Sequence, residues 1–123
     1  MNSFTLEYDD QVYKGQGDCS HTLSGKEVHF TYREEDGEEV NVFIEQDQAG
    51  YLIRETSATR NLYLSLSSNE EEGYLKTPYG MLIFTTCLIE EQFDEEILDL
   101  TFRLNDGQEE NIRHFKLFFG NKK

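Results

Sequence analysis

Apolar and polar residues alternate along almost the whole chain, and this two-residue period is the feature that most restricts the fold. Successive side chains of a β-strand point to opposite faces of a sheet, so the period predicts strands with one buried and one solvated face. No window has a convincing apolar stripe at helical spacing, and we therefore predict an all-β protein. The apolar members of the clearest runs are Phe4, Leu6 and Tyr8; Val28, Phe30 and Tyr32; Val40, Val42 and Ile44; Leu62, Leu64 and Leu66; Leu98, Leu100, Phe102 and Leu104; and Phe115, Leu117 and Phe119.

Short turn signals separate these runs. Asp36-Gly37 and Asp106-Gly107 are two-residue sequences typical of tight β-hairpins. Their short, regular spacing favours consecutive antiparallel hairpins over crossover connections. Two stretches are less regular: we expect a loop or a bulged strand over 13–25, and the acidic stretch 90–96 leaves room for one turn of helix between two strands. About eight or nine strands result, which suits an up-and-down meander closed into a small barrel, with a two-sheet sandwich as the open alternative.

The size and composition of the chain fit a single domain spanning residues 1–123. A hydrophobic content of 37% with one proline is not the profile of a disordered chain. The N-terminus lacks the features of a signal peptide, and no apolar run is as long as a membrane helix. Cys19 and Cys87 show no metal-type or disulfide-scaffold spacing. We therefore expect a cytoplasmic protein whose two thiols are reduced.

The chain is strongly acidic. It has 11 lysines and arginines against 25 aspartates and glutamates, a formal net charge of −14. Such a surface repels phosphate backbones and anionic lipid headgroups, so we expect neither nucleic acid nor membrane as a partner. Solubility is the simplest role for the charge, and a basic protein partner or a cationic ligand stays open as an alternative.

The residues that commonly carry chemistry form no recognisable motif. His21, His29 and His114 lack the spacing of metal ligands, and the chain has no glycine-rich phosphate loop and no nucleophile elbow. Carboxylates are so abundant that pairs of them are uninformative. We therefore assign no catalytic residue, metal ligand or cofactor, and expect a binding protein more than an enzyme.

The segment Thr77-Pro78-Tyr79-Gly80 interrupts an apolar stretch. Pro78 cannot donate a ladder hydrogen bond, and Gly80 permits a positive φ, so the segment predicts a turn, a bulge or a kink at a barrel corner. A functional interpretation places the hydroxyl groups of Thr77 and Tyr79 at the mouth of a barrel.

Two further polar residues are candidates for the barrel interior. Arg54 faces inward if Leu52 does, and an inward arginine needs a partner, such as a ligand carboxylate. If Ile53 faces inward instead, Arg54 lies in water, and alternation alone does not decide between the two. Thr86 follows the parity of Phe84, so we expect an interior hydroxyl there.

One part of the sequence resembles a known family. The segment Gly73–Leu82, followed by Thr85-Thr86, is similar to the hallmark of the YwiB-like proteins, which are small bacterial proteins without an established activity. The Ile53-Arg54 pair and the alternating run Leu98–Leu104 agree in order and spacing, and the likeness covers roughly residues 25–119. The resemblance implies a calycin-type, lipocalin-like β-barrel.

These observations lead to two functional hypotheses. The first is a non-catalytic binding protein that holds a small, partly apolar ligand, anionic if Arg54 anchors it. We expect its site inside the barrel or at its mouth. The second is a protein-interaction or structural module that uses its acidic surface or a strand edge, including as a homodimer. The expected ligand-binding residues are Tyr32, Arg54, Thr77, Tyr79 and Thr86.

Overall fold

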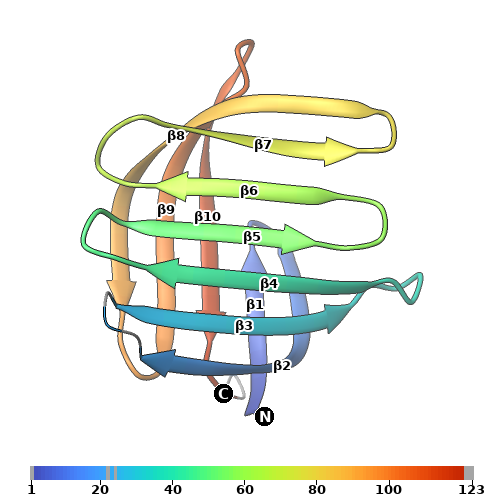
Figure 1. The fold of residues 1–123 in the computed structure, drawn as a ribbon, viewed down its shortest axis with the longest axis vertical. Coiled ribbons are helices and arrows are strands. Elements are labelled where there is room, and N and C mark those ends of the chain that lie inside the picture. Colours follow the sequence, from blue (N-terminus) through green and yellow to red (C-terminus); the bar gives the residue numbers. More distant parts are fainter. Residues whose placement is uncertain (1, 22, 24, 121–123) are drawn as a thin grey trace.

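The computed structural model describes residues 2–21, 23 and 25–120. Each strand pairs antiparallel with the next along the chain, and β1 also pairs with β10, so the meander closes into a barrel (Figure 1). The predicted all-β, up-and-down closed barrel is therefore confirmed, and the sandwich is excluded. The strands are β1 (Asn2–Tyr8), β2 (Gln11–His21), β3 (Lys26–Arg33), β4 (Glu39–Gln46), β5 (Tyr51–Thr56), β6 (Asn61–Leu66), β7 (Glu71–Thr77), β8 (Gly80–Phe93), β9 (Ile97–Asn105) and β10 (Glu110–Phe118).

The barrel has ten strands, slightly more than the number expected from the sequence. Most of the glycine-rich stretch 13–25 belongs to β2, because Gly15 and Gly17 pair with Tyr32 and Phe30 of β3. The acidic stretch that begins at Glu90 continues strand β8 up to Phe93 and holds no helical turn. In both places tertiary pairing overrides a weak local pattern. Among the described residues, no helix is long and apolar enough to cross a membrane.

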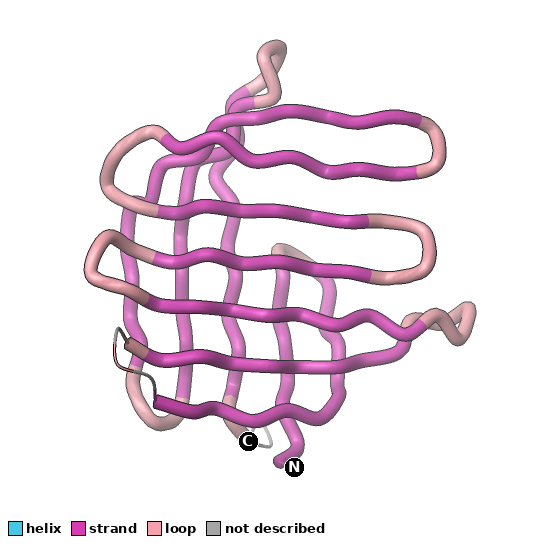
Figure 2. The backbone as a smooth tube through the Cα atoms, in the orientation of Figure 1, coloured by secondary structure: helices cyan, strands magenta, loops and turns pink. Residues whose placement is uncertain are grey.

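The barrel is flattened into two layers whose strands cross steeply. In Figure 1, β3 to β7 run across the front, while β9, β10 and β1 run roughly at right angles behind them. The two longest strands, β2 and β8, bend from one layer to the other, as the tube in Figure 2 shows. β8 carries a register shift between Leu88 and Glu90, and such bulges sharpen a bend.

The middle of the barrel is filled by its own side chains. Inward residues from all sides of the barrel form one apolar cluster, which is the burial that drives folding. The alternation in the sequence therefore predicted the inward face of most strands correctly. The largest fully buried side chains in the cluster are Phe4, Phe30, Phe102 and Phe115, followed by Leu6, Ile44, Ile53, Leu64, Leu66, Leu98, Leu100 and Leu117.

The two ends of the barrel differ. One end, here called the mouth, is ringed by the turns 9–10, 34–38, 57–60, 78–79 and 106–109. The opposite end is covered by aromatic side chains, because the ring of Phe93 lies 6.2 Å from Tyr51 and 5.8 Å from Phe119. The Tyr51 hydroxyl also donates a hydrogen bond to Glu91 at 2.8 Å. Open space that could hold a ligand next to the interior therefore lies at the mouth.

Candidate functional site

A pocket of about 300 Å³ opens at the mouth, directly above the filled core. Residues at inward positions near the ends of nine strands, together with two turn residues, line it, so every strand except β4 contributes. The lining residues are Leu6, Tyr8, Tyr13, Tyr32, Glu55, Arg60, Leu62, Leu75, Leu82, Phe84, Leu104, Asp106 and Arg113.

Three tyrosines from neighbouring strands form one side of this mouth pocket. The rings of Tyr13 and Tyr32 lie 4.4 Å apart, and the ring of Tyr8 packs edge-on against Phe115 of the core at 5.8 Å. In the circular strand order, the leucines of β6 to β9 lie across the barrel from these tyrosines. Leu82 is 46% exposed, so apolar surface is open to an occupant of the pocket.

Arg60 is held at the edge of the pocket by two carboxylates. Its guanidinium lies 2.6 Å from Glu34 and 2.9 Å from Glu55, and the Tyr32 hydroxyl donates to the same Glu55 oxygen at 3.2 Å. These contacts join β3, β5 and the turns 34–38 and 57–60. Side chains linked in this way have few alternative positions, so the polar edge of the pocket is preorganised.

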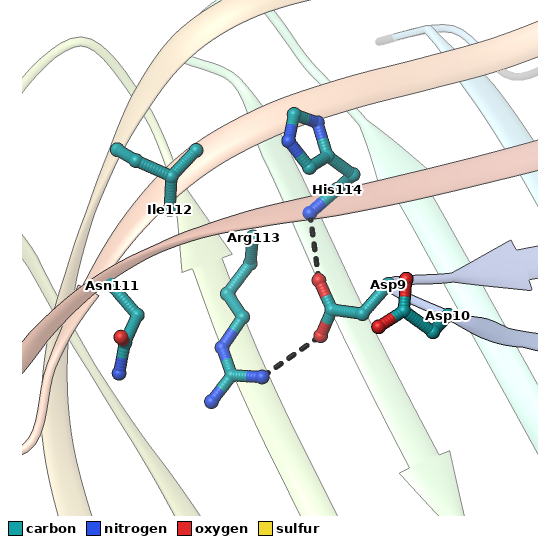
Figure 3. A pocket seen from close by; sticks show the side chains of 6 residues that line it. All are labelled: Asp9, Asp10, Asn111, Ile112, Arg113 and His114. Carbon is teal, nitrogen blue, oxygen red and sulfur yellow. Dashed lines mark hydrogen bonds and ion pairs between the residues drawn. The ribbon is translucent and has the colours of Figure 1, made fainter.

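The second arginine of the pocket, Arg113, is held from the first turn of the chain (Figure 3). The Asp9 carboxylate binds the Arg113 guanidinium at 2.8 Å and accepts a hydrogen bond from the His114 backbone N–H at 3.2 Å. Asp9 adopts a positive φ of 52°, a conformation that is costly outside glycine and that such side-chain bonds stabilise. Arg113 Nε is buried and has no hydrogen-bond partner among the described residues.

The surroundings change the acidity of several pocket groups. Burial, reinforced by the charge of Asp9, raises the pKa of Tyr8 to about 12. Burial and then Glu55 raise the pKa of Tyr32 in the same direction. Burial alone would lower the pKa of Arg60, but Glu55 and Glu34 outweigh it and hold the pKa above its ordinary value. At neutral pH both phenols are therefore protonated donors and the guanidinium is charged.

Of the five residues expected from the sequence, Tyr32 lines the mouth pocket. Thr77 and Tyr79 belong to the β7–β8 hairpin, whose turn lies at the mouth, but neither side chain lines the pocket. The Thr77 hydroxyl accepts the Tyr79 N–H at 3.2 Å and so stabilises the turn, while the Tyr79 ring is fully exposed. The segment Thr77–Gly80 is thus a tight hairpin turn at the mouth.

Arg54 lies on the outer face of the barrel, which corrects the hypothesis of an inward anchor. Ile53 pairs with Ile44 and is 1% exposed, so strand alternation places Arg54 outside. There its guanidinium contacts Glu45 at 3.2 Å, and its side chain is 50% exposed. A ligand inside the barrel or in the mouth pocket is out of its reach.

Thr86 faces the interior, as its parity indicated, but it does not line the mouth pocket. Its hydroxyl donates a 2.6 Å hydrogen bond to the Ser65 carbonyl oxygen. β6 and β7 pair only through Asn61, Leu62 and Tyr63, so beyond these residues β8 contacts β6 directly. Thr86 therefore links two strands where the intervening pairing ends.

Several residues of the mouth pocket were not singled out in the sequence. Arg113 shares the parity of Phe115 and Leu117, and Tyr8 follows Leu6, so alternation contained a signal for both. Arg60 lies in a turn and Tyr13 in the glycine-rich part of β2, where alternation is not informative. Their place in the pocket depends on which strands meet at the mouth.

Comparison with known proteins adds little to this geometry. No model of a known protein family matches the chain, and no curated protein matches it. A solved structure, the ywiB protein from Bacillus subtilis, aligns with 98% of this chain and 88% of its own, with 15% sequence identity and a TM-score of 0.41. The strand pairing itself establishes the closed barrel.

Proposed function

We propose that this chain is a binding protein that holds a small, partly apolar molecule in the mouth pocket. The observation that supports the proposal is a preformed space of about 300 Å³ above a filled core. Its walls are largely tyrosine and leucine, with a few polar groups fixed by mutual contacts. Pockets that recognise small molecules commonly have this combination of apolar walls and few, well-placed polar groups.

The polar part of the ligand would meet groups that are still able to bond. Arg113 Nε is a buried donor without a partner among the described residues, and leaving such a donor unpaired is costly. Tyr8 and Tyr13, which also line the pocket, each carry a further hydroxyl donor. A ligand that carries a hydrogen-bond acceptor would satisfy one or more of these donors, which is our physical reason for a partly polar molecule.

We include in this proposal that the chain is a YwiB-like protein and that it is located in the cytoplasm. The segment Gly73–Leu82, which resembles the YwiB-like hallmark, forms the β7–β8 hairpin, and its members Leu75 and Leu82 line the pocket. On this resemblance we propose that the chain belongs to that calycin-type family. Cys19 and Cys87 form no disulfide, which is compatible with a cytoplasmic protein.

Native mass spectrometry of the protein purified from its own host tests the binding function. We expect a bound small molecule that is present in the native mass and absent after denaturation. Tyr13→Ala should remove this species, because Tyr13 lines the pocket. Tyr63→Ala is the matched control, because Tyr63 is also a partly exposed strand tyrosine but stacks on Tyr74, outside the pocket. A bound species that Tyr13→Ala leaves unchanged would contradict the proposed site.

One observation favours the second candidate, a protein-interaction module. Phe43, Arg54, Tyr63, Tyr74 and Ile83 are successive cross-strand partners, and they form a row across the outer faces of β4 to β8. Phe43, Tyr74 and Ile83 are each more than a third exposed. Exposed apolar rows of this kind often mark contacts with other proteins. The same candidate function through an unpaired strand edge has no such support. β1 pairs with β10, so the closed barrel leaves neither of these terminal strands as a free edge.

Sedimentation analysis tests this second candidate as a homodimer. If the outer row joins two copies, Ile83→Lys should convert the dimer into a monomer. Ile112→Lys is the matched control, because Ile112 has a similar exposure (50% against 52%) but lies on β10, outside the row. A monomer at every concentration would exclude the homodimer.

A further inference from the structure

Negative charge is in excess around the mouth pocket, although two arginines line it. The Arg60 guanidinium is shared by Glu34 and Glu55 at 2.6 and 2.9 Å, and the Arg113 guanidinium is bound by Asp9 at 2.8 Å. Asp106 also lines the pocket. Each arginine is therefore already neutralised, and four carboxylates surround two guanidinium groups.

The pKa shifts of groups around the mouth pocket are consistent with this excess of negative charge. Hydrogen bonds from the backbone N–H groups of Gln108 and Glu109 hold the pKa of Asp106 below its ordinary value, so this carboxylate is ionised at neutral pH. After burial, the nearest carboxylates are the next cause that raises the pKa of Tyr8 and of Tyr13. A cleft with walls of one dominant charge concentrates ligands of the opposite charge.

The tyrosines add a surface that suits a cation. Tyr8, Tyr13 and Tyr32 line the same side of the pocket, and Tyr13 and Tyr32 are in ring contact at 4.4 Å. The face of an aromatic ring attracts a cation within about 6 Å, and the attraction grows when water is displaced. Rings beside the Glu55 carboxylate, which accepts a hydrogen bond from the Tyr32 hydroxyl, are therefore suited to an ammonium group and unsuited to a carboxylate.

Resting on the proposed binding function, we infer that the ligand is an organic cation, an amine or a quaternary ammonium compound with an apolar body. An uncharged acceptor on the same molecule, such as a hydroxyl or carbonyl oxygen, would satisfy the free donors of the pocket. The cationic group lies among the three tyrosines and Glu55. The apolar body packs against Leu62, Leu75 and Leu82 on the other side of the barrel. This assignment replaces the anionic ligand that an inward Arg54 would have favoured.

Three probes with one aromatic ring and similar chain length separate the charge classes: phenethylamine, 2-phenylethanol and 3-phenylpropanoate. Dissociation constants come from chemical-shift titrations of the isotope-labelled protein, which also report where each probe binds. We expect shifts at Tyr8, Tyr13 and Tyr32, with phenethylamine binding at least about tenfold more tightly than 2-phenylethanol and 3-phenylpropanoate binding most weakly.

Glu55→Gln tests the charge directly, because it keeps the shape of the side chain and removes one carboxylate. We expect the preference for phenethylamine over 2-phenylethanol to shrink severalfold, with the affinity for the neutral alcohol retained. Glu45→Gln is the control: Glu45 also pairs with an arginine, Arg54, but on the outer face. The preference of the Glu45→Gln variant for phenethylamine over 2-phenylethanol should match that of the unmodified protein. Thermal unfolding verifies that both variants are folded.

The outcomes separate the two proposals. Equal binding of all three probes at the mouth, or tightest binding of 3-phenylpropanoate there, overturns the cationic ligand and leaves the binding function supported. A preference for phenethylamine that Glu55→Gln does not reduce overturns the assigned position of the cation. If no probe shifts residues of the mouth pocket, both the cationic ligand and the pocket as a binding site are overturned.

Discussion

Thr86 shows how one polar side chain can be used inside an apolar barrel. Its hydroxyl is buried and its donor is satisfied by the Ser65 carbonyl, at the place where β6 and β7 no longer pair. If the hydroxyl donor were removed, the buried carbonyl oxygen would lose this hydrogen bond, and no water could reach it to form another. The residue thus contributes to closing the barrel, and its position in the interior does not imply a ligand.

We predict that Thr86→Val lowers the free energy of unfolding by about 1–2 kcal/mol, because the volume is kept and the hydrogen bond to Ser65 is lost. Urea unfolding measures the change. Thr85→Val, on the outer side of the same strand, is the control and should stay within about 0.5 kcal/mol. Equal stability of the two variants would show that the Thr86 hydrogen bond is unimportant.

Tyr8, which is partly buried, and the buried Tyr51 predict a loss of stability at alkaline pH. Burial, followed by Asp9 for Tyr8 and by Glu91 for Tyr51, raises both pKa values from 10.0 to about 12. Between these values the unfolded chain releases phenolic protons that the folded chain keeps. The free energy of unfolding is therefore undiminished below pH 10 and falls as the pH rises towards 12.

Urea unfolding at a series of alkaline pH values measures this dependence, and Tyr8→Phe should make it shallower. A free energy of unfolding that is constant across the window, or an unchanged slope in Tyr8→Phe, would contradict the assignment.

At the scale of the element, the bent strand β2 depends on a glycine to pack against its neighbours (Figure 2). Gly17 of β2 lies against the backbone of β3 and the ring of Phe4. A Cβ atom there would collide with the His29 carbonyl oxygen and lie 2.7 Å from the Phe4 ring. The absence of a side chain therefore lets β2 pack closely against the core.

We predict that Gly17→Ala lowers the free energy of unfolding by about 1–3 kcal/mol, since the added methyl group overpacks the site. Chemical unfolding of this variant is compared with that of Gln16→Ala, an exposed position on the same strand, which should change by no more than about 0.5 kcal/mol. A Gly17→Ala protein as stable as the control would mean that Phe4 and β3 move aside without cost.

At the scale of the whole molecule, repulsion among acidic groups opposes folding. The formal net charge is −14, and ion pairs such as Arg33–Glu39 lie on the exposed surface and contribute little. Compacting a chain of one dominant charge raises its electrostatic energy. Salt reduces this repulsion because the screening length falls from roughly 30 Å at 0.01 M to about 3 Å at 1 M.

We therefore predict that the thermal unfolding temperature rises as sodium chloride is added over this range. Potassium chloride at equal ionic strength should have the same effect, which separates screening from ion-specific binding. A falling unfolding temperature would indicate that the ion pairs outweigh the repulsion.

The amino-acid sequence by itself determined the class of fold and most of the core. Alternation identified Phe30, Leu100 and Phe115 as inward residues, because burial of one strand face acts on each strand locally. The turn at Thr77–Gly80 was also readable, because proline and glycine have backbone preferences of their own. The number of strands was harder to predict, since the glycine residues of β2 have little intrinsic preference for a strand.

The tertiary structure alone decided the site. The orientation of Arg54 depended on the register between β4 and β5, because shifting a strand by one residue exchanges its two faces. The mouth pocket depends on closure: Arg113 contacts Asp9 across 104 positions of the chain, because β10 pairs with β1. Local alternation shows which way a side chain points. Only the pairing of distant strands determines which side chains meet.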